Sequence, residues 1–276
     1  MALTMPNLTD NRLVRTFAEL RSASRRTVMP FLTAGYPDAE TTVALLADFE
    51  RRGVRICELG VPFSDPIADG PTIQATYTEA IAAGVSSRTV FDVVRRYREG
   101  GGAMAIAAMV SFSIVYRHGV EAYVAALKAA GADAMIVPDL PLDEVGAIEP
   151  AADAAGLANV LLIAPTTPPP RRVRIARSSR GFIYYVSVAG ITGERDRLPD
   201  ETVSAVAELR EQTDTPICVG FGISRPEMVA GVCRVADGAI VGSAILHRIT
   251  DSKGAPRGEL VERVGGFVGE LLAPLR

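Results

Sequence analysis

Eight short apolar runs recur along the chain, separated by stretches with helical periodicity. Each run is continuously apolar and does not alternate between apolar and polar positions, which is typical of parallel strands covered on both faces. We therefore expect eight parallel strands. The runs are Thr27–Thr33, Val54–Leu59, Ala103–Val110, Ala134–Val137, Asn159–Ile163, Phe182–Val186, Pro216–Val219 and Gly238–Val241.

Between these runs, apolar positions recur with the spacing of one helix face. Asp38 favours a helix start immediately before the stretch Ala39–Arg52. An additional helix over Asn11–Ser22 precedes the first strand and could close the bottom of a barrel. The other predicted helices are Val120–Ala130, Asp143–Ala155, Pro168–Ser178, Asp200–Glu211, Arg225–Val232 and Glu259–Leu272.

Strict alternation of strands and helices allows an α/β fold of two kinds, an open doubly wound sheet or a closed barrel. Eight strand–helix units in about 250 residues favour the closed (β/α)8 barrel, the TIM barrel. The 276 residues contain no linker, low-complexity tract or shift in composition. We therefore expect a single domain over residues 1–276, with the extra N-terminal helix.

The charge pattern narrows the classes of partner. The net charge is −3, and the absence of a Lys or Arg block argues against a nucleic-acid or anionic-membrane surface. No window approaches 18 uninterrupted apolar residues, so we expect no membrane span. The cysteines Cys57, Cys218 and Cys233 lack C-x-x-C spacing, which predicts reduced thiols in a cytoplasmic protein and no metal site.

Several loops that follow the apolar runs carry glycine, and in a (β/α)8 barrel the active site forms at these carboxyl ends. Gly222 follows the seventh run, and Gly242 and Ser243 follow the eighth, just before a helix. Glycine lets backbone N–H groups approach an anion, and a helix N-terminus adds favourable charge. With Gly193 in a third loop, these residues predict a phosphate site, although each glycine alone could simply form a tight turn.

The second run ends in a carboxylate, Glu58. Near a barrel interior this group should be desolvated, which raises its pKa and suits general-acid chemistry; pairing with a basic residue at the barrel mouth is the alternative. Asp65 and Asp69 follow in a loop rich in proline and glycine. Either could form turn hydrogen bonds, so the residues alone do not decide which of the two is catalytic.

Six segments, one per barrel unit, carry longer patterns. They are MPFLTAGYPD (Met29–Asp38), ELGVPFSDPIADGPTIQ (Glu58–Gln74), IVPDLPLDE (Ile136–Glu144), GFIYYVSVAGITGER (Gly181–Arg195), VGFGIS (Val219–Ser224) and ADGAIVGSAI (Ala236–Ile245). These segments, in this order, closely resemble the motifs of the tryptophan synthase alpha-subunit family. The resemblance spans about residues 27–250.

The resemblance implies a lyase that splits indole-3-glycerol phosphate into indole and glyceraldehyde 3-phosphate, in tryptophan biosynthesis. It makes Glu58 the acid and base at indole C3 and at the glycerol hydroxyl. Asp69 would receive the indole N–H, and Thr192 would contact Asp69 when its loop closes. Gly193, Gly222, Gly242 and Ser243 would bind the phosphate, in agreement with the glycine pattern.

The resemblance also implies an apolar slot for the indole ring. The residues expected to line it are Phe31, Ile73, Ile163, Tyr184, Phe221 and Ile240. No metal or organic cofactor is implied for this chain, because the pyridoxal phosphate of the full synthase belongs to the beta subunit.

The loop after the third run departs from the family pattern. The family has M-x-Y-x-N-P here, whereas this chain has Met109-Val110-Ser111-Phe112-Ser113-Ile114. Because this loop contributes to beta-subunit contact in the family, the change over Ser111–Ser113 puts the alpha2beta2 partnership in doubt.

Four hypotheses follow. The first is a synthase alpha subunit acting with a beta subunit, and the second is a free-standing lyase that releases indole. A catalytically silent partner of a beta subunit is the third, and the intact Glu58 and Asp69 argue against it. The fourth is another phosphate-binding barrel enzyme, such as an aldolase or an isomerase. The aldolase version is weakened because no Lys lies at an obvious strand C-terminus for Schiff-base chemistry.

Overall fold

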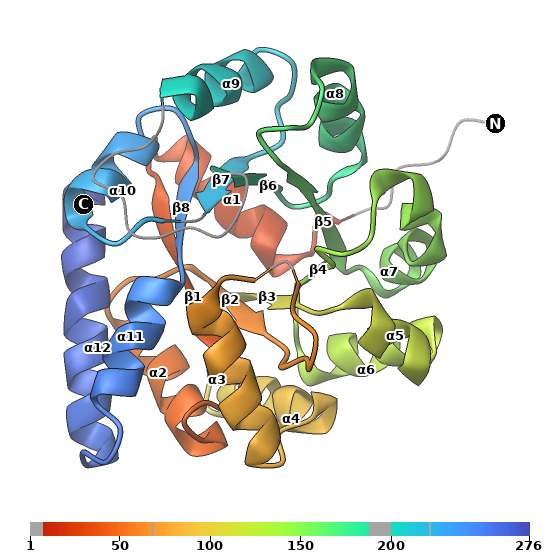
Figure 1. The fold of residues 1–276 in the computed structure, drawn as a ribbon. Coiled ribbons are helices and arrows are strands. Elements are labelled where there is room, and N and C mark those ends of the chain that lie inside the picture. The colour runs from red at the N-terminus through yellow and green to blue at the C-terminus, as the bar shows by residue number, and fades with distance from the viewer. Residues whose placement is uncertain (1–7, 68, 188–199, 221) are drawn as a thin grey trace.

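The strands close into a parallel barrel in the computed structural model, which describes residues 8–67, 69–187, 200–220 and 222–276. Each strand pairs with the next in chain order, and β8 pairs with β1 (Figure 1). The predicted (β/α)8 barrel is therefore confirmed. The strands are β1 (Thr27–Thr33), β2 (Ile56–Gly60), β3 (Ala105–Met109), β4 (Ala134–Ile136), β5 (Ala158–Ile163), β6 (Ile183–Val186), β7 (Ile217–Gly220) and β8 (Gly238–Val241).

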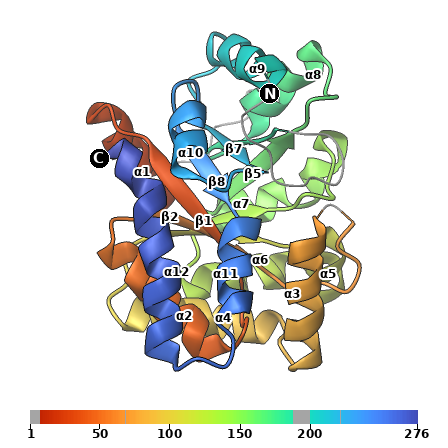
Figure 2. The same ribbon diagram turned by 60° about the vertical axis from the view of Figure 1, so that its left-hand side comes forward.

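Helices surround the barrel, and α12, α11 and α3 lie side by side on one flank (Figure 2). The helices are α1 (Arg12–Ser22), α2 (Ala39–Arg51), α3 (Pro71–Ala82), α4 (Ser87–Glu99), α5 (Phe112–His118), α6 (Val120–Ala130), α7 (Glu149–Ala155), α8 (Pro169–Ser178), α9 (Asp200–Arg210), α10 (Pro226–Val232), α11 (Ser243–Asp251) and α12 (Arg257–Leu272). The 3-10 helices are η1 (Leu142–Ala147) and η2 (Ala273–Leu275). Among the described residues, no helix combines the length and the apolar character that crossing a membrane requires.

The prediction of one continuous helix over Asp143–Ala155 is wrong. The stretch Asp143–Ala155 is not a single helix, because η1 ends at Ala147 and α7 begins at Glu149. Pro150 explains the break: its ring lacks an N–H and would clash with the carbonyl of Gly146 in a continuous helix. The loop after β4 is therefore shaped independently of the helix that follows it.

Helix α1 covers the end of the barrel where the strands begin. Asn11, the residue before this helix, donates side-chain hydrogen bonds to the carbonyl oxygens of Asp133 (2.7 Å) and Gly156 (3.0 Å), which precede β4 and β5. Phe17 of α1 packs on Phe182, just before β6, with ring centroids 5.8 Å apart. The extra helix thus closes the barrel's bottom as predicted and leaves the opposite end for chemistry.

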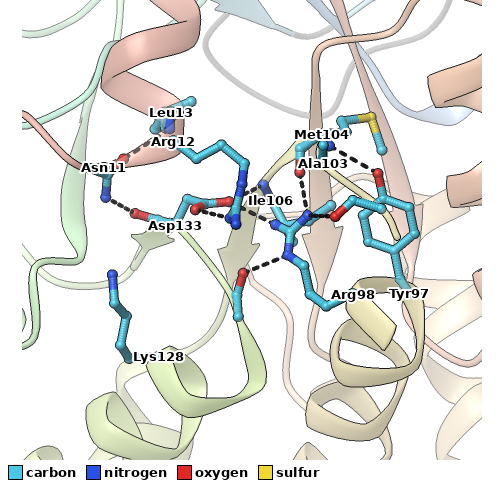
Figure 3. Close-up of polar contacts among 12 residues, drawn as sticks. Asn11, Arg12, Leu13, Tyr97, Arg98, Ala103, Met104, Ile106, Lys128 and Asp133 are labelled. Atoms are coloured by element: carbon cyan, nitrogen blue, oxygen red, sulfur yellow. Dashed lines mark hydrogen bonds and ion pairs between the residues drawn. The ribbon is translucent and has the colours of Figure 1, made fainter. Parts of the chain in front are cut away.

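The buried carboxylate of Asp133 links several elements at the end of the barrel where the strands begin (Figure 3). It accepts a hydrogen bond from Arg12 of α1 at 2.5 Å and another from Arg98 of α4 at 2.9 Å. The backbone N–H of Ile106 in β3 donates to the same carboxylate at 2.9 Å. Arg98 also donates to the carbonyl oxygen of Met104 at 2.8 Å. One carboxylate therefore joins α1, α4, β3 and the start of β4.

Candidate active site

Glu58 is the one charged residue in the described strands, and its side chain is fully buried. Within the part of the chain that the structure describes, neither carboxyl oxygen has a hydrogen-bond partner. Other buried carboxylates differ in this respect: Asp48, for example, accepts from Arg51 and Arg52 at 2.7 and 2.6 Å. A buried polar group without a partner is costly and needs an explanation. The carboxyl group of Glu58 is therefore a candidate to form its hydrogen bonds with a bound molecule.

The environment of Glu58 favours its neutral, protonated form. Burial raises the pKa of Glu58 to about 8, and the negative charge of Asp69 contributes to the increase. A carboxylic acid that holds its proton at neutral pH can deliver that proton to a substrate. The expected desolvation is thus present, and among the described residues Glu58 has no basic partner.

Asp69 lies between β2 and α3, in a loop that is held by its backbone. The N–H of Asp69 donates to the carbonyl oxygen of Pro66 at 3.1 Å, and the side chain of Gln74 in α3 donates to the carbonyl oxygen of Asp69 at 2.8 Å. The side chain is half-buried, and burial raises the pKa of Asp69 to about 7, with a contribution from Asp139. Asp65 is exposed and accepts from Ser64 at 2.6 Å, so it shapes the loop.

Aromatic side chains pack closely around Glu58. Phe31 of β1 is its partner in the strand register. A Cβ atom at Gly60 would lie 2.5 Å from both the Phe31 ring and the Tyr77 hydroxyl, so only glycine allows this approach. Burial raises the pKa of Tyr184, and the negative charges of Glu58 and Asp69 add to the increase. Contact of Phe31 and Tyr184 with an indole ring stays a prediction.

The other residues expected in the slot are distributed as follows. Ile73 is half-buried in α3, and Ile240 of β8 is buried beside Met29 of β1. Ile163 is fully buried in β5 and pairs with Tyr185, whereas its neighbour Leu162 pairs with Tyr184. The contact of these residues with indole stays a prediction.

The predicted phosphate residues are partly described. Gly222 has a φ of +77°, a conformation that glycine adopts without strain. Gly242 directly precedes α11, and Ser243 is the exposed first residue of that helix. Thr192, Gly193 and Phe221 lie outside the described residues. The geometry of Gly242 and Ser243 fits the expected helix N-terminus, and phosphate binding stays a prediction.

A pocket at the carboxyl ends of β2, β3 and β4 brings in residues that were not predicted as site residues. Besides the predicted Asp69, the polar lining residues are Asp65, Tyr77, Ser111 and Asp139, together with apolar side chains. Asp139 could have been predicted as a site residue, because it comes just after the β4 run and residues at the carboxyl ends of barrel strands form the active site. Tyr77 was missed because no helix was predicted where α3 lies.

These features define a class of protein: a (β/α)8 barrel with a buried, unpartnered carboxyl group and a polar pocket near the carboxyl ends of its strands. The family model of the tryptophan synthase alpha chain matches residues 17–270. The chain belongs to the tryptophan synthase alpha chain family.

Individual relatives agree with this membership. The tryptophan synthase alpha chain of Rhodopirellula baltica is 48% identical over 238 residues, which make up 86% of each chain. The tryptophan synthase subunit alpha of Legionella pneumophila has a TM-score of 0.88 at 31% identity, over 96% of this chain and 98% of that one. A chain from the tryptophan synthase complex of Pyrococcus furiosus has a TM-score of 0.81 at 33% identity, over 90% and 99%.

Proposed function

We propose that this chain cleaves indole-3-glycerol phosphate to indole and glyceraldehyde 3-phosphate in tryptophan biosynthesis, with Glu58 and Asp69 as its catalytic residues. The observation that carries the proposal is the buried, unpartnered carboxyl group of Glu58 beside a second carboxyl group. A retro-aldol cleavage needs a proton donor at the ring carbon and a negative charge near the ring nitrogen. The two raised carboxyl pKa values suit these two tasks.

A single carboxyl group, that of Glu58, can both donate and accept the proton that the reaction transfers. Protonated Glu58 delivers its proton to indole C3, and the positive charge that forms on the ring is stabilised by Asp69 at N1–H. Ionised Glu58 then takes the proton of the C3′ hydroxyl. The O–H electron pair forms the aldehyde C=O bond, and the pair of the breaking C–C bond restores the aromatic ring. No net proton is gained or lost, and the step uses no metal or organic cofactor.

Binding residues complete the proposed site. Phe31 and Tyr184 would hold the indole ring and keep water from Glu58, in line with their burial. Gly222, Gly242 and Ser243 would hold the phosphate with backbone N–H groups and the N-terminus of α11. Thr192 and Gly193, outside the described residues, keep their expected roles in loop closure and phosphate binding.

The pH dependence of indole release tests this proposal. The reaction needs ionised Asp69 and protonated Glu58, whose pKa values are about 7 and about 8. The value of kcat/KM should therefore rise with pH through about 7 and fall through about 8. Asp69→Asn should lose the rising limb and keep a falling limb, which moves to lower pH because the charge of Asp69 no longer raises the pKa of Glu58. A rate that stays constant between pH 5 and pH 9 would contradict the assignment.

We also propose a beta-subunit partner that docks beside this pocket. Large apolar side chains are exposed there, Ile67 in the loop after β2 (89% exposed) and Tyr116 in α5 after β3 (73%). Phe112 packs against Tyr116, with ring centroids 6.0 Å apart. Exposed aromatic side chains are frequent anchors of protein interfaces. The relative from Pyrococcus furiosus was solved in a tryptophan synthase complex.

Adding a matching beta subunit should form a complex and raise the cleavage rate. Tyr116→Ala should weaken that complex by about tenfold, the effect of losing about 1.4 kcal/mol, and leave the activity of the isolated chain unchanged. Ile81→Ala, which truncates an exposed apolar side chain of α3, is the matched control and should bind normally. If no complex forms while the isolated chain releases indole, the chain is a free-standing lyase.

A further inference from the structure

Asp139, just after β4, is held firmly by the loop that follows β3. The hydroxyl of Ser111 donates to its carboxylate at 2.7 Å, and the backbone N–H of Phe112 lies 2.9 and 3.1 Å from its two oxygens. The N–H of Ser113 in turn donates to the Ser111 hydroxyl at 3.2 Å. The segment in which this chain departs from the family pattern therefore fixes one carboxylate in a defined position.

The fixed carboxylate shares its pocket with Asp69. Asp65, Asp69, Tyr77, Ser111 and Asp139 all line it, and no Lys, Arg or His is among the described lining residues. Among the lining residues that the structure describes, no cation therefore offsets the negative charge of Asp139. In a partly desolvated pocket, a nearby negative charge destabilises the ionised form of a carboxyl group such as that of Asp69.

Besides Asp139 and the loop neighbour Asp65, the described ionisable groups that interact with Asp69 come from three elements. Glu58 lies on β2, Tyr77 on α3 and Tyr184 on β6, and each interacts electrostatically with Asp69. None of these carries a positive charge. Burial is the main cause of the raised pKa of Asp69, and Asp139 is the group whose charge adds to it.

We propose that Asp139, anchored by Ser111, is a positioning residue that sets the charge state of Asp69 and thereby the lower pH limit of cleavage. The proposal rests on the proposed function of Asp69. Asp139 keeps Asp69 protonated to a higher pH than burial alone would, so the negative charge needed at indole N–H is present only near neutrality. Ser111 acts by holding the Asp139 carboxylate toward the pocket.

The test compares the pH dependence of kcat/KM for the wild type and Asp139→Asn, a change that removes the charge and keeps the shape. The rising limb should move to lower pH by roughly half a unit to one unit. At pH 6, activity relative to its maximum should increase roughly threefold to fivefold. A merely structural role would lower activity at every pH without moving the limb.

Two further variants complete the comparison. Asp143→Asn is the matched control, because Asp143 is exposed outside this pocket and pairs with Arg171 and Arg174. It should leave the rising limb in place. Ser111→Ala should move the limb in the same direction as Asp139→Asn by a smaller amount, and Ser111→Thr, which keeps the hydroxyl, should restore the wild-type position.

A readout without substrate separates this proposal from the proposed function. Titration of the Asp69 carboxyl carbon by NMR, assigned with Asp69→Asn, should show a lower pKa in Asp139→Asn than in the wild type. An unchanged titration would overturn the proposal even if the chain cleaves its substrate. If Asp139→Asn does not fold, Ser111→Ala decides the question by the same two measurements, and no shift in either overturns it.

Discussion

Glu58→Gln is expected to lower kcat/KM for cleavage of indole-3-glycerol phosphate by roughly 10²–10⁴-fold, the usual contribution of a positioned general acid. The amide keeps the size of the side chain and cannot give a proton to indole C3 or take one from the hydroxyl. Indole release by the purified variant measures the effect. Glu79→Gln changes an exposed carboxylate of α3 that pairs with Lys253, and it should keep wild-type activity.

The same substitution should increase stability at alkaline pH, which separates lost chemistry from lost folding. The pKa of Glu58 is about 8 in the folded chain against a usual value of 4.5. Between these two values the folded state holds a proton that the unfolded state has released, so wild-type stability falls as pH rises through this range. Above pH 8 the charged group stays buried at a constant cost.

Glutamine has no such cost, so the free energy of unfolding of Glu58→Gln should exceed that of the wild type at pH 9. The difference should be on the order of a few kcal/mol, since one pKa unit corresponds to about 1.4 kcal/mol. At pH 4 the two proteins should be similar. Urea unfolding at both pH values measures this difference. A variant that is less stable than the wild type at pH 9 would contradict the claim that burial of the ionised Glu58 carboxylate lowers stability.

Asp133→Ala is expected to lower the free energy of unfolding by roughly 3–5 kcal/mol, the usual effect of removing one partner of a buried ion pair. The Asp133 side chain is only 5% exposed and that of Arg98 only 14%. Without the carboxylate, Arg98 keeps a mostly buried charge, and the N–H of Ile106 loses its side-chain acceptor. Urea unfolding at neutral pH measures the loss.

Asp143→Ala is the matched control for Asp133→Ala. Asp143 also pairs with two arginines, Arg171 and Arg174, but its side chain is 55% exposed. Water screens such surface pairs, so this change should cost less than about 1 kcal/mol. Equal losses for the two variants would show that burial of the Asp133 network does not determine its contribution.

The barrel could be predicted from the apolar runs because all its strands are covered by helices on the outside and by side chains within. Thr27–Thr33 and Gly238–Val241 were predicted with the observed bounds. Helix α3 was missed because Pro71 begins it inside a loop-like segment. Helix α4 could have been found, since Val90, Val94 and Tyr97 follow helical spacing after Ser86.

The site could be predicted where one residue stands out against its neighbours. Glu58 interrupts an apolar strand, and its burial follows from that position alone. Asp65 and Asp69 could not be separated by residue type, because the difference lies in exposure that only the folded loop defines. The contact between Ser111 and Asp139 joins loops 28 residues apart, so no local pattern could reveal it.

The most direct test of the central claim is the stoichiometry of products from purified wild type and Glu58→Gln, each supplied with indole-3-glycerol phosphate at pH 7.5. The wild type should release indole and glyceraldehyde 3-phosphate in equal amounts, and Glu58→Gln should release almost none. The absence of indole from the wild type, with or without a beta subunit, would contradict the account. So would a folded Glu58→Gln variant that works at the wild-type rate.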